Sequence, residues 1–509
     1  MKHYMGVGGE HLHDSGITII DDSGNIKFAS LVERFTGIKH DPYPPQDFLR
    51  EHYQAYENVE PVHNDDWRER ERFRVGLFDS IRIDGRTTKM DPNRDWWGQH
   101  HTIRNHRLSQ HHTSHTAAAF ATRPQSFDKE DCVLVAIDGV GEFRSLVIQD
   151  HNFNVKYEVN FPKSIGYLYA NFTNSLGGLK ANEDEYVVMG KSCYGEPTHW
   201  EEAWEMFQCI PNWTMEDQDG MEDAHWDEKY KVKMLFLKKI VKFLLTKCKH
   251  ENDAAASLQR MTEEFIYTIM LEARKYGSKL CYSGGVAQNI MANNRIRSLF
   301  DDVWIDVNPG DGGASLGAAA YFYMMDTGRD RINWKHPFLG YNIEGYLDPE
   351  EVVDYIMKNK VAGVANGPAE FSYRAYGNRS LIADVRYDVK DTVNEIKQRQ
   401  KYRPFAPAIL AEHANEYFDG YMNEWMQYTA QAKHDYSSVT HVDGSGRVQL
   451  VPKDSNTVFR KILECYYDKT GVPMLLNTSL NIRRKPMVNC EKHALEFQNR
   501  YGVKVFTKS

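Results

Sequence analysis

Two histidines four positions apart, His111 and His115, are the residues of this sequence best suited to chemistry. The Ser and Ala residues around them favour a helix, which places positions i and i+4 on one face. Two imidazoles at that spacing can hold one metal ion and leave the other coordination positions to carboxylates, water or substrate. His112 points to a different face. Because the same spacing is common on ordinary polar helices, the pair predicts a metal site only if suitable carboxylates occur elsewhere.

Two aspartates in glycine-rich turns are candidates for those carboxylates. Asp138 ends an apolar run and is followed by Gly139 and Gly141. Asp311 stands at an expected strand-to-helix turn that continues through Gly313. A catalytic or metal-binding carboxylate is often found at such a turn, and the alternative for Asp311 is a simple helix N-cap.

An apolar hairpin that carries an aspartate and glycines occurs twice, in residues 13–30 and in residues 133–158. This repetition predicts two related halves that face one another across a cleft; two unrelated hairpins in a mixed α/β domain are the alternative. Glycine-flanked turns let backbone N–H groups approach phosphate oxygens, so the expected ligand is a nucleotide. Gly284 and Gly285, between a further apolar strand and a helix, could receive an anion in the same way.

The rest of the chain indicates a second domain. Helices are expected over residues 229–276, where one apolar face would be formed by Leu235, Leu237, Ile240, Val241, Phe243 and Leu244. Prolines and glycines around residues 336–348 are typical of a linker. We therefore expect an α/β domain over residues 1–335 and a second α/β domain over residues 349–509.

Cationic side chains are spread over that second domain. Arg403 precedes a rigid apolar segment, and a strand near Asn477 and Ser479 ends in small polar donors. Arginine matches phosphate and carboxyl oxygens bidentately, so converging arginines would form a pocket for a small phosphorylated anion. Surface ion pairing is the alternative.

Length and composition narrow the class of protein. A chain of 509 residues with 41% hydrophobic and 12% aromatic residues is expected to form two or three globular domains. The net charge of −9 argues against a generally basic nucleic-acid-binding surface, although residues 67–107 are rich in arginine and tryptophan and could bind nucleic acid or form a salt-bridged surface. Seven scattered cysteines without Cys-x-x-Cys indicate reduced thiols, and no run is long enough to span a bilayer. We therefore expect a cytoplasmic protein without a membrane partner.

Ten short motifs in order resemble the O-carbamoyltransferase family, which includes the nodulation-factor, tobramycin and cephamycin enzymes, and the resemblance covers nearly the whole chain. The motifs are His13-Asp14-Ser15, Glu33-Arg34-Phe35-Thr36 with Lys39-His40, His111-His112-x-x-His115, Asp138-Gly139-x-Gly141-Glu142, Gly284-Gly285-Val-Ala-x-Asn289, Gly310-Asp311-x-Gly313, Arg374-Ala-x-Gly377-Asn378-Arg379-Ser380, Arg403-Pro-Phe-Ala-Pro, Asp443-Gly444-x-x-Arg447-x-Gln449 and Asn477-Thr478-Ser479-x-Asn481.

The resemblance implies a fold and a reaction. The first domain would be of the actin-like ATPase (ASKHA) type, similar to the tRNA-threonylcarbamoyl-transferring enzymes, and the second would be YrdC-like. Carbamoyl phosphate would bind in the second domain and release carbamate, ATP would convert carbamate into carbamoyl adenylate, and the first domain would transfer the carbamoyl group to an acceptor alcohol.

The resemblance also implies roles for particular residues. The metal ligands would be His111, His115, Asp138 and Asp311, with Fe(II) as the expected ion, Zn or Mn as alternatives, and Mg accompanying ATP. Nucleotide would be bound by Gly139, Gly141, Gly284, Gly285, Asn289 and Gly313. Carbamoyl phosphate would be bound by Arg374, Lys397, Arg403, Arg447, Asn477 and Ser479. His13 and Asp14 would be catalytic, and Lys39 would bind the acceptor.

Departures from the family pattern lie on the acceptor side. The chain has Val32 before Glu33 where a double Glu is usual, Gly37 in place of an arginine, and Met189-Gly190-Lys191-Ser192 in place of Met-Gly-Leu-Ala. With the arginine-rich segment 67–107, they favour the hydroxymethyl group of 5-hydroxymethylcytosine in DNA as acceptor, in a host cytoplasm if the protein is phage-encoded. A sugar or antibiotic hydroxyl, a non-catalytic actin-like nucleotide-binding module and threonylcarbamoyl transfer to tRNA are the alternatives. Free nucleotide and polymer are both compatible with these residues.

Overall fold

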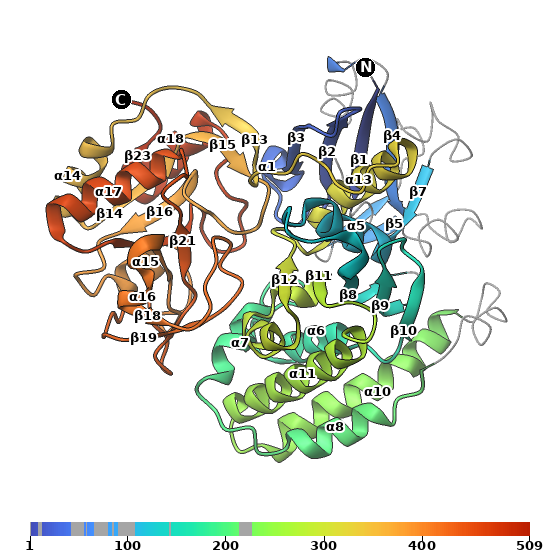
Figure 1. Cartoon of the computed structure of the whole chain (residues 1–509). Coiled ribbons are helices and arrows are strands. Elements are labelled where there is room, and N and C mark those ends of the chain that lie inside the picture. The colour runs from blue at the N-terminus through green and yellow to red at the C-terminus, as the bar shows by residue number, and fades with distance from the viewer. Residues whose placement is uncertain are drawn as a thin grey trace. The chain divides into compact units, whose positions relative to one another are not determined.

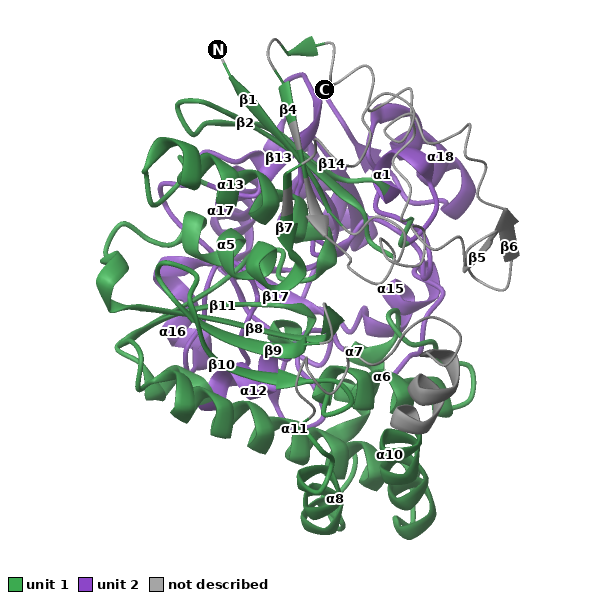
Figure 2. Ribbon diagram, turned by 90° about the vertical axis from the view of Figure 1, so that its right-hand side faces the viewer, with its two compact units in different colours: residues 1–32, 40–288, 296–335 green, residues 33–39, 289–295, 336–509 purple. Residues whose placement is uncertain are grey.

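The chain folds into two compact α/β units, so the predicted fold class is confirmed (Figures 1 and 2). The computed structural model describes residues 2–8, 13–41, 55–56, 59–65, 80–83, 86–89, 107–141, 144–212 and 226–509. Unit 1 comprises residues 1–32, 40–288 and 296–335, and unit 2 comprises residues 33–39, 289–295 and 336–509. Among the described residues, no helix combines the length and the apolar content needed to cross a membrane.

The first sheet of unit 1 has its strands in the order β3-β2-β1-β4-β7. They are β1 (His3–Gly8), β2 (Gly16–Asp21), β3 (Ile26–Leu31), β4 (Val59–Asp65) and β7 (Arg107–Gln110). The first three strands are antiparallel neighbours, and β4 and β7 continue the sheet in parallel to β1. The β2–β3 turn forms because Asp21 accepts hydrogen bonds from the backbone N–H groups of Ser23 and Asn25, while Gly24 takes a φ of +89° that favours glycine.

The second sheet repeats this plan in the order β10-β9-β8-β11-β12. Its strands are β8 (Cys132–Gly141), β9 (Arg144–Asp150), β10 (Val155–Asn160), β11 (Lys279–Ser283) and β12 (Asp302–Ile305). Again three antiparallel strands come first and two parallel strands follow. The predicted duplication is therefore confirmed: the two hairpins open two sheets of the same topology, as expected for an actin-like domain.

Helices α5 (His111–Thr122) and α13 (Ala314–Thr327) join the two sheets of unit 1. Helix α13 packs on β1, β2 and β4, helix α5 packs on β8 and β11, and the two helices pack on each other. Every residue of α5 is buried. The approach is close because Gly317 lacks a side chain: a Cβ there would lie 1.7 Å from the carbonyl oxygen of Ser114.

A helical layer packs against the second sheet (Figure 1). It contains α6 (Ile165–Ser175), α7 (Glu185–Ser192), α8 (Trp200–Gln208), α10 (Trp226–Lys247) and α11 (Glu251–Ala273). The helices predicted over residues 229–276 are thus present. Leu237, Ile240, Val241 and Leu244 are buried, but Leu235 is 50% exposed, so including it in the predicted apolar face was wrong. It lies about 160° around the helix from Leu237 at 100° per residue.

Unit 2 is built on a six-stranded sheet in the order β21-β17-β22-β16-β14-β23. These strands are β14 (Val361–Ala365), β16 (Arg379–Ala383), β17 (Ala406–Leu410), β21 (Gln449–Val451), β22 (Met474–Ser479) and β23 (Val505–Phe506). Two apolar clusters contain residues of this sheet, one with helices α14 (Pro349–Asn359) and α17 (Val458–Thr470) and the other with helix α18 (Glu491–Tyr501).

The segment interpreted as a linker, residues 336–348, holds a strand instead. Strand β13 (Phe338–Ile343) pairs antiparallel with β15 (Gly367–Glu370), because its apolar and polar residues suit an edge strand despite the flanking proline and glycines. Unit 2 also includes helix α1 (Glu33–Thr36), which comes from far upstream in the sequence.

Candidate functional site

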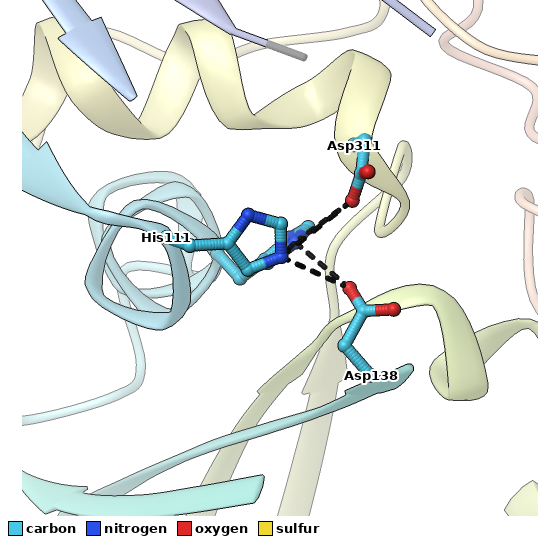
Figure 3. A group of neighbouring side chains, drawn as sticks. His111, Asp138 and Asp311 are labelled. Carbon is cyan, nitrogen blue, oxygen red and sulfur yellow. Dashed lines mark hydrogen bonds and ion pairs between the residues drawn. The ribbon is translucent and has the colours of Figure 1, made fainter. Parts of the chain in front are cut away.

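The four residues predicted as metal ligands lie together in unit 1. One ligand atom from each of His111, His115, Asp138 and Asp311 lies within 4.8 Å of the others. The Nε2 atoms of the two histidines are 3.2 Å apart, and His115 Nε2 lies 3.0 Å from Asp138 Oδ2 and 3.3 Å from Asp311 Oδ1. Figure 3 shows the His111 ring and the two carboxylates converging on one point.

The electrostatics of this cluster favour a positive charge. Burial by itself would lower the pKa of His115, but Asp138 and Asp311 outweigh that effect and raise this pKa to about 10. Burial would raise the pKa of Asp138, but hydrogen bonds from His111 and His115 hold it well below its usual range. Two imidazoles and two carboxylates that stabilise positive charge in a buried site are a chemically suitable donor set for a divalent cation.

Local sequence explains how each ligand reaches the cluster. His111 and His115 lie one turn apart in α5, Asp138 lies in β8, and Asp311 lies in the short turn before α13. Gly141 leaves room for the His111 ring, since a Cβ at Gly141 would lie 2.3 Å from His111 Cδ2.

The predicted nucleotide-binding glycines surround Asp138. The backbone N–H of Gly139 donates to Asp138 Oδ1 at 2.6 Å, and that of Gly285 donates to Asp138 Oδ2 at 3.3 Å. Gly284 has a φ of +91°, and a Cβ there would lie 2.2 Å from Ile137 O.

The other two predicted nucleotide-binding residues differ in their placement. A Cβ at Gly313 would lie 1.9 Å from Asn308 O, so this loop approaches its neighbour closely. Asn289 belongs to unit 2, where its Oδ1 accepts a hydrogen bond from the N–H of Ala292 at the start of helix α12 (Ile290–Ile296).

The predicted catalytic pair lies beside the cluster and includes a third residue. His13 Nδ1 is 2.9 Å from Asp14 Oδ2, and His13 Nε2 is 3.6 Å from Asp311 Oδ2. The other oxygen of Asp14 is 2.5 Å from His40 Nδ1. Asp14 therefore fixes the orientation of both rings. The sequence analysis gave His40 no role, although His40 follows Lys39 in the second of the ten motifs.

Predicted donor-binding residues of unit 2 form a group of interacting cations. Burial, followed by the charges of Arg374 and Arg403, lowers the pKa of Arg447 to about 9. Burial, followed by Arg399 and Arg403, lowers the pKa of Lys397 well below its usual range. Arg403 acts on both Arg447 and Lys397, so these cationic side chains contribute to one electropositive region of unit 2.

Neighbouring polar groups hold this region in place. Lys397 Nζ donates to Ser479 Oγ at 3.2 Å and to Asn481 Oδ1 at 3.0 Å. Arg374 donates to the carbonyl oxygen of Trp425 at 3.1 Å. Asn481 belongs to the last of the ten motifs, but the sequence analysis gave it no role. Its two-residue spacing from Ser479, at the end of a strand, could have indicated that both residues hold Lys397.

The two polar atoms of the Asn477 side chain differ: the amide nitrogen donates two hydrogen bonds, and the amide oxygen accepts none from the described residues. Its Nδ2 donates to Gln449 Oε1 at 2.6 Å and to the carbonyl oxygen of Ala375 at 3.0 Å. Its Oδ1 is buried and has no hydrogen-bond partner within the described part of the chain. Asn477 and Ser479 lie two positions apart in β22 and therefore share a face of the sheet.

The predicted acceptor-binding lysine is part of unit 2. Lys39 Nζ lies 2.8 and 2.7 Å from the two carboxylate oxygens of Glu33 and 5.3 Å from the centre of the Tyr373 ring. Arg34, which is 1% exposed, donates to the carbonyl oxygens of Glu370 and Ser372. These buried hydrogen bonds of Arg34 hold the segment 33–39 on unit 2.

Comparison with known proteins gives the class of this protein: it is an enzyme that transfers a carbamoyl group. The family model "Carbamoyltransferase N-terminus" matches residues 81–320, and "Carbamoyltransferase C-terminus" matches residues 353–507. The chain therefore belongs to the carbamoyltransferase family, as its motifs predicted. Membership implies a carbamoyl donor and an acceptor hydroxyl.

Individual relatives agree with this assignment. Nodulation protein NolO from Bradyrhizobium diazoefficiens is 30% identical over 425 residues, covering 76% of this chain and 75% of that protein. Nodulation protein NolNO from Sinorhizobium fredii is 30% identical over 431 residues, covering 74% of this chain and 59% of that protein.

Among solved structures, T. kodakarensis HypF matches with 12% identity and a TM-score of 0.33 over 64% of this chain and 48% of its own.

Proposed function

We propose that this carbamoyltransferase uses carbamoyl phosphate and ATP to form carbamoyl adenylate, and that it transfers the carbamoyl group to the hydroxymethyl group of 5-hydroxymethylcytosine in DNA. In this scheme water cleaves carbamoyl phosphate to carbamate and phosphate. A carbamate oxygen then attacks the α-phosphorus of ATP and releases pyrophosphate. Finally the acceptor oxygen attacks the carbamoyl carbon, and AMP leaves.

The observation that carries the donor assignment is the cation group of unit 2. Lys397 Nζ contacts Ser479 Oγ at the end of β22, Arg374 is held by the carbonyl oxygen of Trp425, and neighbouring arginines together with burial lower the pKa values of Arg447 and Lys397. The phosphate group of an acyl phosphate would offset this positive charge and accept hydrogen bonds from Arg403, Arg447 and Lys397. The buried, unpartnered Oδ1 of Asn477 suits the NH₂ group of a carbamoyl donor, which must give a hydrogen bond.

We assign the cluster of unit 1 to a divalent cation. His111, His115, Asp138 and Asp311 would hold the ion, with Fe(II) favoured by the family resemblance and Zn or Mn compatible with the same donors. A bound cation supplies Lewis-acid polarisation of carbonyl and phosphate oxygens, and Mg²⁺ would accompany ATP. The glycine-lined turns at Gly139, Gly141, Gly284, Gly285 and Gly313 are proposed to approach the nucleotide phosphates. For Asn289 we keep the nucleotide-binding role that the family resemblance implies.

His13 is proposed as the base that accepts the proton of the acceptor hydroxyl. In the neutral ring with Nδ1 donating to Asp14, Nε2 is the nitrogen that can accept a proton, and it lies 3.6 Å from Asp311 Oδ2. Burial alone would lower the pKa of His13, but Asp311, Asp14 and Asp138 raise it to about 10, and a cation held by the cluster would oppose that rise and favour the neutral ring. Lys39 is proposed to contact the acceptor while Glu33 and Tyr373 hold its ammonium group.

The choice of DNA rests on the acceptor-side departures. Lys191, at a position where the family pattern has leucine, pairs with Glu251. The arginine-rich segment 67–107 lies mostly outside the described residues, and Arg107 itself is paired with Asp326 at 2.8 Å. Binding of DNA would therefore require cationic residues other than Arg107.

A direct assay tests the whole scheme. The enzyme is incubated with ATP, carbamoyl phosphate and a panel of alcohols: DNA with 5-hydroxymethylcytosine, the free 5-hydroxymethylcytosine nucleotide, an aminoglycoside and an oligosaccharide. Mass spectrometry should detect carbamoyl addition to the DNA, together with AMP and pyrophosphate. Carbamoylation of the aminoglycoside or oligosaccharide alone would overturn the DNA assignment, and release of ADP instead of AMP would overturn the adenylate.

A further inference from the structure

The C-terminal part of helix α10 and the turn after it carry a dense set of lysines without acids. Residues 235–250 contain five lysines, Lys238, Lys239, Lys242, Lys247 and Lys249, and no aspartate or glutamate. The whole chain, in contrast, has a net charge of −9. This stretch is therefore a local basic segment on an acidic protein.

The lysines face solvent because the other side of the helix is apolar and packed. Leu237, Ile240, Val241 and Leu244 are at most 5% exposed, and α10 packs on α6, α8 and α11. Lys238, Lys239, Lys242 and Lys249 are exposed. At 100° per residue the three lysines on the helix, Lys238, Lys239 and Lys242, fall within about 100° of arc opposite the buried side, and Lys249 lies in the turn just after the helix ends. We call these four residues the lysine face.

Its charges are uncompensated within the described part of the chain. None of the four lysines forms an ion pair there, whereas Lys191 pairs with Glu251 and Lys275 pairs with Glu272. Lys247, which lies closer to α8, is close enough to Glu202 to lower the pKa of that carboxyl. The lysine face is thus available to an anionic partner that the protein itself does not supply.

We propose that the lysine face binds the phosphate backbone of the DNA that carries the acceptor base. The inference rests on the proposed function and adds that the acceptor is a polymer. From Lys238 to its end at Lys247, two residues before Lys249, the helix rises about 14 Å, and duplex DNA presents one charge per about 1.7 Å of axis over such a length. Lysine is a mobile point charge that contacts phosphates without reading sequence.

The packing of α10 favours DNA over an anionic membrane. A membrane-bound amphipathic helix needs a free apolar face, and the apolar residues of α10 are buried in the protein, with Leu235 as the exposed exception. Helix α6 contacts both α10 and β8, the strand that carries Asp138 of the candidate metal cluster. Helix α6, beneath α10, begins where the Ser164 hydroxyl donates to the carbonyl oxygen of Gly139 at 2.6 Å, next to Asp138. Figure 1 shows α10 on the side of the helical layer away from β8.

A binding experiment tests the surface independently of catalysis. The full-length variant K238Q/K239Q/K242Q/K249Q is compared with the wild type by fluorescence anisotropy on an unmodified duplex over a range of salt concentrations. The plot of log K against log salt concentration should lose a slope of up to about 3.6, or about 0.9 for each phosphate contact removed. The control variant K335Q/K358Q/K453Q/K461Q removes four exposed lysines elsewhere and should keep the wild-type slope.

An activity experiment then separates the two proposals. The lysine-face variant should lose roughly tenfold or more in kcat/KM on hydroxymethylated DNA, with unchanged kcat/KM on the free hydroxymethylated nucleotide. Equal DNA binding by wild type and variant, an equal loss in the control variant, or binding to vesicles of 30% phosphatidylserine without DNA binding would each overturn the lysine face. DNA binding that depends on the lysine face without any carbamoylation of DNA would support the surface and overturn the proposed acceptor.

Discussion

At the scale of single residues, the backbone conformation of Asp14 decides how two histidine rings are oriented. It has a φ of +60°, a left-handed conformation that aspartate tolerates better than most residues. This conformation directs one carboxylate to two rings, His13 and His40. Burial would raise the pKa of Asp14, but the two histidines hold it well below its usual range. An ionised Asp14 therefore fixes which nitrogen of His13 carries the proton.

Asp14→Asn should impair the transfer step while leaving donor activation intact. The amide cannot accept from both rings through the same pair of oxygens, so His13 loses its fixed tautomer and its function as a base. General-base catalysis contributes about 10²–10⁴ in rate, and we expect a fall in kcat within that range. Carbamoylated product and AMP are measured separately in single-turnover experiments. The exposed Asp22→Asn serves as the control, and a parallel loss of AMP formation would contradict the assigned role.

Lys397 should make donor binding depend on pH. Burial and the neighbouring arginines lower the pKa of the free lysine, and a bound phosphate dianion would raise it again. Between these two pKa values, binding takes up one proton, so affinity falls as pH rises through this interval. Titration calorimetry of carbamoyl phosphate in two buffers of different ionisation enthalpy measures the proton uptake. Arg500→Lys on the surface is the control, and binding with no proton exchange at any pH would refute the linkage.

At the scale of elements, the candidate metal cluster depends on the close packing of α5 on α13. The first helix carries both histidines, and the second begins just after Asp311. Small residues at their interface bring the imidazoles within reach of the carboxylates. A helix pair with ordinary side chains at its interface would be about 8–10 Å apart between axes.

Gly317→Ala should therefore weaken both the fold and the cation site. The new methyl group would overlap Ser114 O, and overpacking of this kind costs about 1–3 kcal/mol of unfolding free energy. We expect a lower Tm and a reduced metal content by elemental analysis. Gly177→Ala is the matched control, because a Cβ at Gly177 meets nothing within 4 Å. Wild-type metal content in the Gly317 variant would show that the helix spacing does not govern the site.

At the scale of the whole molecule, the two units are not two consecutive stretches of sequence. Residues 33–39 and 289–295 interrupt unit 1 and pack with unit 2. The buried Arg34 anchors the first segment, and Asn293 anchors the second by donating to the carbonyl oxygen of Gln427 at 3.0 Å. Mutations in these two segments should consequently change the stability of unit 2.

Unit 2 should lose stability in acid through Asp384. This fully buried carboxylate accepts hydrogen bonds from Tyr466 at 2.7 Å and from Arg386 at 2.8 Å. Burial would raise the pKa of Asp384, but these partners lower it below its usual range. A depressed pKa contributes stability above the unfolded-state value of about 3.9, and this contribution is lost as pH falls through the folded-state value.

Asp384→Asn should thus cost about 2 kcal/mol at neutral pH and reduce the pH dependence of unfolding below about pH 4. Hydrogen exchange followed by mass spectrometry reports the two units separately, and the loss of protection should be confined to unit 2. The exposed Asp388→Asn is the control. An acid transition with unchanged slope would mean that other carboxylates govern it.

The sequence by itself determined the fold class, the duplicated hairpins, the helices after residue 229, the family and the four residues that meet in the candidate metal cluster. These features depend on local patterns, such as the i, i+4 spacing of His111 and His115, and on motifs that can be read in order. Only the tertiary structure decided that Asn289 and Lys39 belong to unit 2, that β13 occupies the expected linker, and that His40 shares Asp14 with His13. Chain segments distant in sequence meet through packing and buried hydrogen bonds, and no local pattern of residue types specifies which surfaces will meet.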